Sequence, residues 1–224
     1  MTQTVSDRPQ VSRQKAAKVV FASGDVIFTE GDPPDRVYLI TAGKVRLGRV
    51  SHTGRECLYT VFGGSDVIGE VAVLDGTPQP ATAVAMTDVR ALAWNRAQLS
   101  ELVTTHPSAA EHLMRVLARR IRRTSDDITD LMSATVSARV AKHLLRLAQQ
   151  FGQQDHGVIR LTMDLNQEQF AHLAGTSREC VNRSLAEFCE RGWIRLCDNA
   201  IEIVDSQPLA QRMDGARRLG VVHR

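Results

Sequence analysis

Residues 166–193 constrain the fold more than any other stretch, because their pattern predicts two short helices joined by a tight turn. Asn166 can cap the first helix, and Gln169 stands three residues later, where its side chain completes a capping box. Apolar residues then recur at helical spacing. Gly175 follows, and glycine is the residue in which the left-handed backbone that ends a helix costs least. The first helix is therefore expected to stop there.

The second predicted helix begins after Thr176, which can cap it with Glu179 as the partner in a capping box. Its apolar residues recur at helical spacing and predict one buried stripe, formed by Val181, Leu185 and Phe188. Gly192 is placed to end this helix. Two short helices around a glycine turn indicate a helix-turn-helix.

The polar side of this second helix carries side chains that can read the edges of DNA bases. They are Ser177, Arg178, Glu179, Asn182 and Arg183. Arginine can contact guanine with two hydrogen bonds, a carboxylate can accept one from cytosine, and asparagine can pair with adenine. A helix-turn-helix places such residues in the first turns of its second helix. A plain helical hairpin with a solvated polar face has the same spacing and stays open as an alternative.

The segment Ser177–Arg183 resembles the recognition helix of the cyclic-AMP receptor/FNR family of bacterial transcription regulators. The resemblance extends from about Phe21 to Leu209 and implies half-sites of the GTG…CAC type in a palindrome. It also implies a role for each polar residue. The expected base-reading residues are Arg178, Glu179 and Arg183, and the expected contacts to the DNA backbone are Gln167, Thr176, Ser177 and Asn182.

Length and composition agree with a protein of two domains. A chain of 224 residues can form two domains of about 100 residues each, and 43% of it is hydrophobic. The formal net charge of +3 is too small to indicate DNA binding by itself, so the placement of the charges must decide. No apolar run approaches the length of about 18 residues that a membrane span needs, and the polar N-terminus resembles no secretory signal. We therefore expect a cytoplasmic protein without a membrane partner.

The cysteines and histidines do not indicate a metal site or an enzyme. The four cysteines show no metal-ligand spacing, and residues 1–56 contain none, which excludes the iron–sulfur branch of the family. A redox role for Cys180, Cys189 and Cys197 stays open beside the commoner interpretation as small buried thiols. His52 is the single histidine between residues 18 and 95, so a metal enzyme of the cupin type is not expected. We expect neither catalytic residues nor an essential cofactor.

Residues 18–95 read as β-structure, with turn residues about every ten positions, which suits a jelly roll of two sheets. The apolar runs Val37–Ile40 and Val45–Val50 predict one hairpin with Gly43 in its turn. This pattern resembles the cyclic-nucleotide-binding domain of the family. The resemblance therefore implies that the jelly roll binds a small effector.

Residues 69–82 lie where the family builds its nucleotide-binding cassette. By resemblance, Glu70 accepts a hydrogen bond from the ribose 2′-hydroxyl, and Gly69 lets the backbone approach the ligand. The family then has an arginine and a serine or threonine that grip the cyclic phosphate, whereas this chain has Gln79 and Pro80. Glutamine has no charge and proline has no backbone N–H. The loss is expected to cost about 1.5–3 kcal/mol, or about ten- to a hundredfold in affinity for cyclic AMP.

From residue 100 to about 135 the pattern becomes helical, and after His106 and Pro107 residues recur at alternating steps of three and four, as in a coiled coil. This seam consists of Met114, Leu117, Ile121, Thr124, Ile128, Leu131 and Thr135. Its narrow width favours a parallel homodimer over packing within the chain. By resemblance, Thr124 and Ser125 match the residues that hydrogen-bond adenine, and Arg120 matches a basic residue where nucleotide and helix meet.

We therefore predict an α+β protein with an N-terminal jelly roll, a long dimerisation helix and a C-terminal winged helix-turn-helix. The predicted parts are a polar arm (1–17), a jelly roll (18–105), a dimerisation helix with its hinge (106–135), a winged helix-turn-helix (136–209) and a basic tail (210–224) that includes Arg212. The wing is expected in the hairpin around Cys197–Asn199, and a polar loop is expected at residues 152–157.

The predicted function is a homodimeric regulator that binds double-stranded DNA under the control of a small ligand such as cyclic AMP. RNA polymerase is the partner that the resemblance implies, with residues 154–157 as the contact. Two alternatives stay open. The first is a regulator of the same fold that binds DNA without a ligand, which Gln79 and Pro80 favour. The second is a cyclic-nucleotide-binding module that acts on a protein partner and would not need Arg178.

Overall fold

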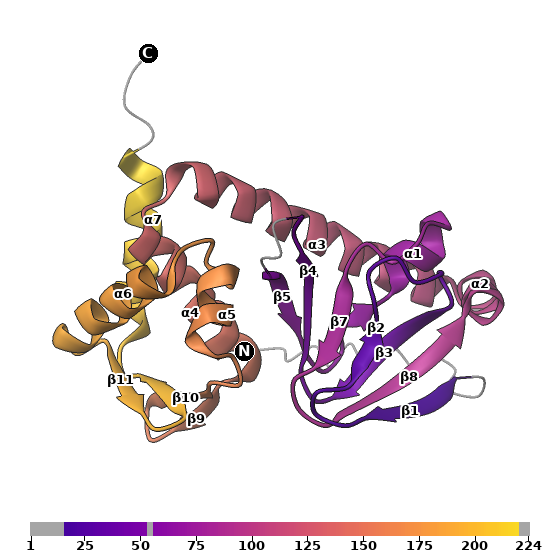
Figure 1. Ribbon diagram of the computed structural model, residues 1–224, viewed down its shortest axis with the longest axis horizontal. Coiled ribbons are helices and arrows are strands. Elements are labelled where there is room, and N and C mark those ends of the chain that lie inside the picture. Colours follow the sequence, from indigo (N-terminus) through magenta and orange to yellow (C-terminus); the bar gives the residue numbers. More distant parts are fainter. Residues whose placement is uncertain (1–15, 53–55, 220–224) are drawn as a thin grey trace, which may run out of the picture. The chain divides into compact units, whose positions relative to one another are not determined.

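The computed structural model of this chain describes residues 16–52 and 56–219 (Figure 1). The chain forms two compact units, one from Met1–Leu47 with Val61–Arg123 and the other from Gly48–Thr60 with Thr124–Arg224. Except for its last two positions, the polar arm predicted for residues 1–17 lies outside the described residues.

Two four-stranded sheets form the β-rich N-terminal domain and confirm the predicted jelly-roll class. The first has the order β1 (Ala17–Phe21), β8 (Val89–Asn95), β3 (Arg36–Ala42) and β6 (Val67–Ile68). The second has the order β2 (Val26–Phe28), β7 (Thr82–Ala85), β4 (Val45–Val50) and β5 (Glu56–Phe62). In the first sheet β8 is paired on both sides, since Ala93 lies opposite both Ala17 and Tyr38.

The predicted hairpin between Val37–Ile40 and Val45–Val50 is wrong, because β3 and β4 belong to different sheets. Gly43 does make the turn, with a φ of 91°, and a Cβ atom there would collide with the Asp88 carbonyl oxygen. Two apolar runs around a glycine predict a turn correctly. They do not specify whether the second strand pairs with the first or crosses to the opposite sheet.

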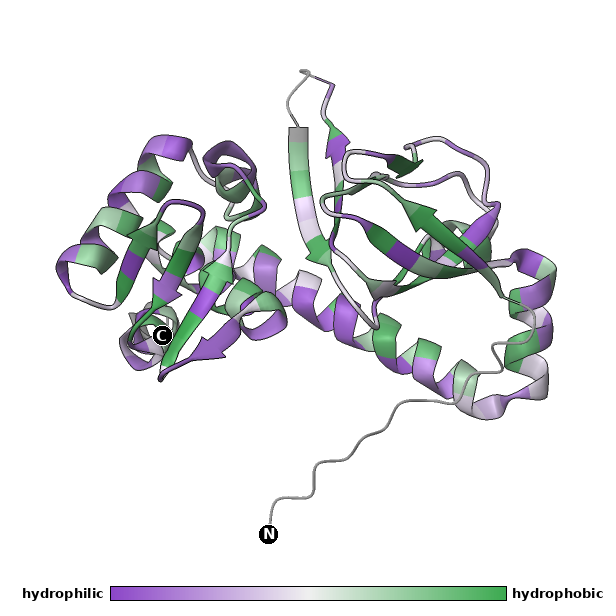
Figure 2. Cartoon of the chain, turned by 90° about the horizontal axis from the view of Figure 1, so that it is seen from below, coloured by the Kyte–Doolittle hydropathy of each residue, from purple (hydrophilic) through white to green (hydrophobic). Residues whose placement is uncertain are grey.

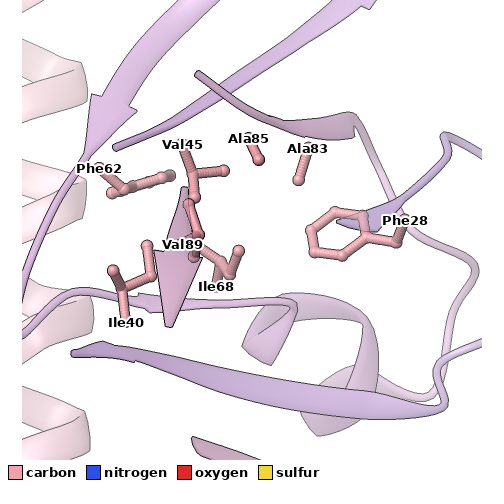
Figure 3. Packing of buried hydrophobic residues seen from close by; sticks show 8 residues of the cluster. All are labelled: Phe28, Ile40, Val45, Phe62, Ile68, Ala83, Ala85 and Val89. Atoms are coloured by element: carbon pink, nitrogen blue, oxygen red, sulfur yellow. The ribbon is translucent and has the colours of Figure 1, made fainter. Parts of the chain in front are cut away.

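Buried apolar side chains from both sheets pack together in the jelly roll (Figure 3). The cluster consists of Phe28, Ile40, Val45, Phe62, Ile68, Ala83, Ala85 and Val89. A second cluster joins the first sheet to the helices α1 (Glu70–Asp75) and α2 (Arg96–Thr105) through Val73 and Leu99. Burying each large apolar side chain stabilises the fold by about 1.5–3 kcal/mol. This core holds the start of α1, a short helix that the sequence analysis did not predict.

The long helix α3 (Pro107–Ser133) begins directly after His106, as predicted. In the single chain several residues of the predicted seam are exposed, including Met114 (62%), Ile121 (69%) and Ile128 (54%). Apolar and polar residues alternate along α3 in Figure 2. These seam residues are therefore not covered by other described parts of this chain.

The helix α4 (Val136–Phe151) follows α3 after a short break, and Thr135 caps it by accepting a hydrogen bond from the Ala138 N–H at 3.3 Å. A four-stranded sheet in the order β11 (Ile194–Cys197), β12 (Ala200–Ile203), β10 (Val158–Thr162) and β9 (Gln153–Asp155) packs with the helices. The hairpin of β11 and β12 is the predicted wing. Residues 153–155 form a strand because they pair with Val158–Arg160. This strand corrects part of the loop predicted at residues 152–157.

A cluster of charged side chains joins the end of α3 to α4. Lys142 Nζ lies 2.8 Å from an Asp127 oxygen and also pairs with Asp130, while Arg146 Nη1 donates to both Asp127 oxygens at 2.6 and 2.8 Å. Burial raises the pKa of Asp127, but the hydrogen bond from Lys142 and the charge of Arg146 outweigh it, and the pKa is lowered. Burial beside this cluster lowers the pKa of His143 to about 4.

Candidate functional site

The helix-turn-helix begins as the sequence predicts, with α5 (Gln167–Leu173) and α6 (Arg178–Glu190) packed against each other. The Asn166 side chain accepts from the Gln169 N–H at 2.8 Å, and the Gln169 side chain accepts from the Asn166 N–H at 3.1 Å. This reciprocal pair confirms the capping box. Gly175 has a φ of 60°, which confirms the left-handed turn after α5.

An arginine that the sequence analysis missed holds the turn between α5 and α6. The Arg139 guanidinium donates from Nε to the Ala174 carbonyl and from Nη2 to the Gly175 carbonyl, both at 3.0 Å. Its Nη1 atom donates at 2.9 Å to the carbonyl of Ala134, just after α3. A Cβ atom at Gly175 would collide with Leu131 of α3. The turn is therefore docked on the junction of α3 and α4.

The cap of α6 is Ser177, which corrects the prediction of Thr176. The Ser177 hydroxyl accepts from the Cys180 N–H at 3.3 Å, and α6 starts at Arg178. The Thr176 N–H instead donates to the Ala171 carbonyl at 2.9 Å, so Thr176 still belongs to the turn. Both residues can cap a helix, and the tertiary position of the turn selects between them.

The two sides of α6 differ as predicted. Its buried side consists of Val181, Ser184, Leu185 and Phe188. The other side exposes Ser177, Arg178, Glu179, Asn182 and Arg183 to solvent. In a helix, residues four apart are neighbours, so Arg178 lies beside Asn182 and Glu179 beside Arg183. The structure thus presents the three predicted base-reading residues together on one exposed face.

Local hydrogen bonds organise the start of this face. Arg178 Nε donates to the Gln167 side chain at 3.1 Å, which joins the first turns of α5 and α6. A hydrogen bond from Ser177 lowers the pKa of Glu179, so the exposed Glu179 carboxylate is an anionic acceptor at neutral pH. The Ser177 hydroxyl also lowers the pKa of the Cys180 thiol, and Thr176 adds to this effect.

Two of the predicted ligand residues, Glu70 and Arg120, form an ion pair in the jelly roll. Glu70, only 1% exposed, pairs through Oε1 with Arg120 Nη1. Arg120 Nη2 also donates to the Val67 carbonyl at 2.7 Å, and its guanidinium lies 4.5 Å from the centre of the Phe62 ring. Burial raises the pKa of Glu70, while the charge of Arg120 opposes this rise. The positive charge of Arg120 is thus already engaged by a buried carboxylate.

Gln79 lies close to the start of α1, with its side chain buried. Its backbone is fixed on both sides, because its N–H donates to the Asp32 carbonyl at 2.8 Å and its carbonyl accepts from the Gly31 N–H at 2.9 Å. Gly69 has a φ of 77°, and a Cβ atom there would lie 3.6 Å from Gln79 Nε2. The structure therefore brings Gly69, Glu70, Gln79 and Arg120 together. The neighbouring residue, Pro80, is exposed.

Thr124 and Ser125 are exposed on α3 and belong to the second unit, and their predicted contact with a ligand stays a prediction. Within residues 16–52 and 56–219, no group of three or more histidines, cysteines or acidic residues is arranged to hold a metal ion. In the same described part of the chain, no helix is long and apolar enough to cross a membrane.

Comparisons with known proteins match both domains of the chain. The Cyclic nucleotide-binding domain family matches residues 18–106, and the Crp-like helix-turn-helix domain family matches residues 138–212. A CRP-like cAMP-activated global transcriptional regulator from Mycobacterium tuberculosis is 47% identical over 87% of both chains. A Cyclic AMP receptor protein from Thermus thermophilus is 33% identical over 86% of both chains. The crystal structure of a CRP/FNR-family transcriptional regulator, also from Thermus thermophilus, matches 89% of this chain and 100% of its own, with a TM-score of 0.72 and 28% identity. The chain therefore belongs to the cyclic-AMP receptor/FNR family of bacterial transcription regulators.

Proposed function

We propose that this transcription regulator binds a palindromic DNA site as a homodimer, with one α6 helix in the major groove of each half-site. The observation that carries this proposal is the exposed face of α6, where Arg178, Glu179 and Arg183 stand away from the buried stripe. In this mode the two recognition helices lie about 34 Å apart, one turn of B-DNA. The expected half-sites are of the GTG…CAC type.

In this proposal the side chains divide into those that read bases and those that hold phosphates. Arg178 and Arg183 donate to guanine, and the anionic Glu179 accepts from cytosine. The residues proposed to contact the DNA backbone are Gln167, Thr176, Ser177 and Asn182. The hydrogen bond between Arg178 and Gln167 supports this division, since it links a base-reading residue to the start of α5.

The homodimer is supported by the exposed seam of α3. Isolated large apolar residues are common on protein surfaces, but here they recur along one helix at coiled-coil spacing. Two copies of α3 would bury Met114, Ile121 and Ile128 against one another. The heavily charged flanks of the helix, which include Arg119, Arg122 and Arg123, would stay in water.

We propose further that a small ligand in the jelly roll controls DNA binding, with Gly69, Glu70, Gln79, Pro80 and Arg120 at the site and with contacts from Thr124 and Ser125 of α3. The similar protein from Mycobacterium tuberculosis is described as cAMP-activated, which makes cyclic AMP the first candidate. A second candidate function, DNA binding without a ligand, is favoured by one observation. The cation beside Glu70 is already paired, and the buried Gln79 brings no charge for a phosphate.

RNA polymerase is the proposed partner for activation. The residues between β9 and β10 are exposed and form the end of a short hairpin, where Gly157 has a φ of 85°. An exposed hairpin on the DNA-binding unit is a suitable contact surface, and residues 154–157 are the proposed contact.

Binding of purified protein to a GTG…CAC palindrome and to a scrambled duplex of equal length tests the DNA-reading face. The Arg183→Ala variant is expected to lose about 1–3 kcal/mol on the palindrome and little on the scrambled duplex. Arg90→Ala removes an exposed arginine from the jelly roll and serves as the matched control. Equal losses on both duplexes would remove Arg183 from the base-reading set.

A further inference from the structure

The helix α7 (Ser206–Leu219) is packed into the DNA-binding unit, whereas the sequence predicted a solvated basic tail from residue 210. Its anchor is Leu209, which is fully buried, and the helix contacts α4. Arg212 therefore lies one turn after a buried anchor. A long side chain at such a position can reach neighbouring elements with little loss of conformational freedom.

Arg212 connects two elements that are far apart in sequence. Its Nε atom donates to the Ser137 hydroxyl at 3.1 Å, and its Nη2 atom donates to Glu187 Oε1 at 2.7 Å. Ser137 is in the first turn of α4, and Glu187 is in the last turn of α6. One planar guanidinium thus spans from the helix that follows α3 to the far end of the recognition helix. Arginine suits this position because its donors are held in one rigid plane.

Glu187 is well placed to receive such a contact. A carboxylate near the C-terminus of a helix is disfavoured by the helix dipole, so a neighbouring cation stabilises it there. Arg191 Nε also lies 3.2 Å from Glu187 Oε1, and its guanidinium sits 5.1 Å from the centre of the Trp193 ring. Trp193 in turn stacks on Phe188, at 5.6 Å between ring centres. The last turn of α6 is therefore held from two sides.

We propose that Arg212 is a positioning residue for DNA reading, which makes α7 a working part of the recognition unit. Base-reading side chains must be held within about 0.5 Å of their productive positions by the residues behind them. Arg139 holds the turn before α6, and Arg212 holds the opposite end of the same helix against α4. Together they determine the angle at which α6 presents its exposed face. This inference rests on the proposed DNA-reading role of α6.

The test uses the full chain and two duplexes, the palindrome and a scrambled sequence, at one salt concentration. Arg212→Ala is expected to weaken binding to the palindrome by about tenfold and binding to the scrambled duplex by less than about twofold. Arg212→Lys keeps the charge but lacks the planar fork, so its loss should be intermediate. Glu187→Ala combined with Arg212→Ala should lose less than the sum of the two single losses, because both changes break the contact between Arg212 and Glu187.

Arg160→Ala is the matched control. Glu202 in the wing sheet is also paired with two arginines, Arg160 at 3.0 Å and Arg195 at 3.5 Å. Removing Arg160 therefore deletes a comparable ion pair of the same unit without touching α6. The ratio of palindrome to scrambled affinity should fall for Arg212→Ala and stay unchanged for Arg160→Ala, although both variants lose an arginine charge.

Two results would overturn the inference. The first is an equal loss of affinity for both duplexes, with a slope of log affinity against log salt that is smaller by about one. This result would make Arg212 a ligand of the DNA backbone instead. Unchanged binding to both duplexes would mean that the contact with Glu187 is dispensable. The Arg183→Ala variant separates these outcomes from a failure of the proposed function. If that variant retains its preference for the palindrome, the base-reading role proposed for Arg183 fails. If it loses the preference while Arg212→Ala does not, the positioning role alone fails.

Discussion

Two glutamates of this chain show how the surroundings of a carboxylate decide what it can do. Glu179 is exposed at the start of α6, and the hydrogen bond from Ser177 lowers its pKa, so it meets a partner as an anion. Glu70 is buried, burial raises its pKa, and Arg120 supplies the opposing charge inside the fold. In the proposed roles, a ligand at Glu70 must therefore adapt to an existing ion pair, whereas DNA that contacts Glu179 need not break one.

At the same scale, His143 is expected to make the fold sensitive to acid. Burial lowers its pKa to about 4 in the folded chain, from 6.5, among Asp127, Asp130, Lys142 and Arg146. Between pH 6.5 and 4 the unfolded chain binds a proton that the folded chain does not, so the free energy of unfolding falls as the pH falls. Above pH 6.5 both states are neutral at this residue and the dependence vanishes. The complete loss approaches about 3 kcal/mol.

Urea unfolding at about pH 7 and about pH 4.5 measures this loss. His143→Gln should flatten the pH dependence, because glutamine does not titrate. His156→Gln removes an exposed histidine and should leave the dependence as it is. If the free energy of unfolding of His143→Gln falls with pH as steeply as that of the wild type, the acid sensitivity comes from other groups.

At the scale of elements, the exposed seam of α3 is the contact surface of the proposed homodimer. Replacing Ile121 and Ile128 by arginine is expected to separate the proposed dimer, because two apolar positions per chain become charged. Each buried isoleucine contributes about 1.5–3 kcal/mol, so the dissociation constant should rise by more than about a hundredfold. Sedimentation velocity over a range of protein concentrations measures this shift.

Asp126→Arg is the control for this prediction, since it places the same charge on an exposed position outside the seam of the same helix. It should leave the proposed dimer intact. The monomeric double variant should still unfold in one cooperative thermal transition, because both isoleucines are exposed in the single chain and contribute little to its core. A double variant that remains a dimer would place the dimer contact elsewhere.

Local patterns predicted the elements well and their partners less well. The capping box of Asn166 with Gln169 and the buried stripe of α6 depend on neighbours within a few residues, and the sequence shows them directly. The pairing of β3 with β8 depends on residues about 50 positions away, so an adjacent hairpin was predicted in its place. Likewise, no short-range pattern joins Arg212 to Glu187, and a basic tail was expected from residue 210, where α7 packs.

For the whole molecule, the question is whether a ligand in the jelly roll and DNA at α6 influence one another. Such coupling requires that the ligand bind two states of the protein with different affinity. It is also reciprocal, so a ligand that tightens DNA binding by some factor must itself bind more tightly by the same factor when DNA is present. A regulator that binds DNA without a ligand would show no such factor. The two proposed modes of control therefore differ in the factor by which cyclic AMP and DNA change each other's affinity for the protein.

Calorimetric titration with cyclic AMP, with and without the palindrome, decides between them. Gln79→Arg is expected to bind cyclic AMP about ten- to a hundredfold more tightly than the wild type, because it adds a guanidinium for the phosphate. Gln79→Met keeps a long neutral side chain at the same buried position and should not gain affinity. Micromolar binding by the wild type, tightened by DNA, would make the missing arginine unnecessary and the protein a nucleotide-gated regulator. Binding by Gln79→Arg alone would show that the natural chain has given up the phosphate contact, and DNA binding should then be independent of cyclic AMP.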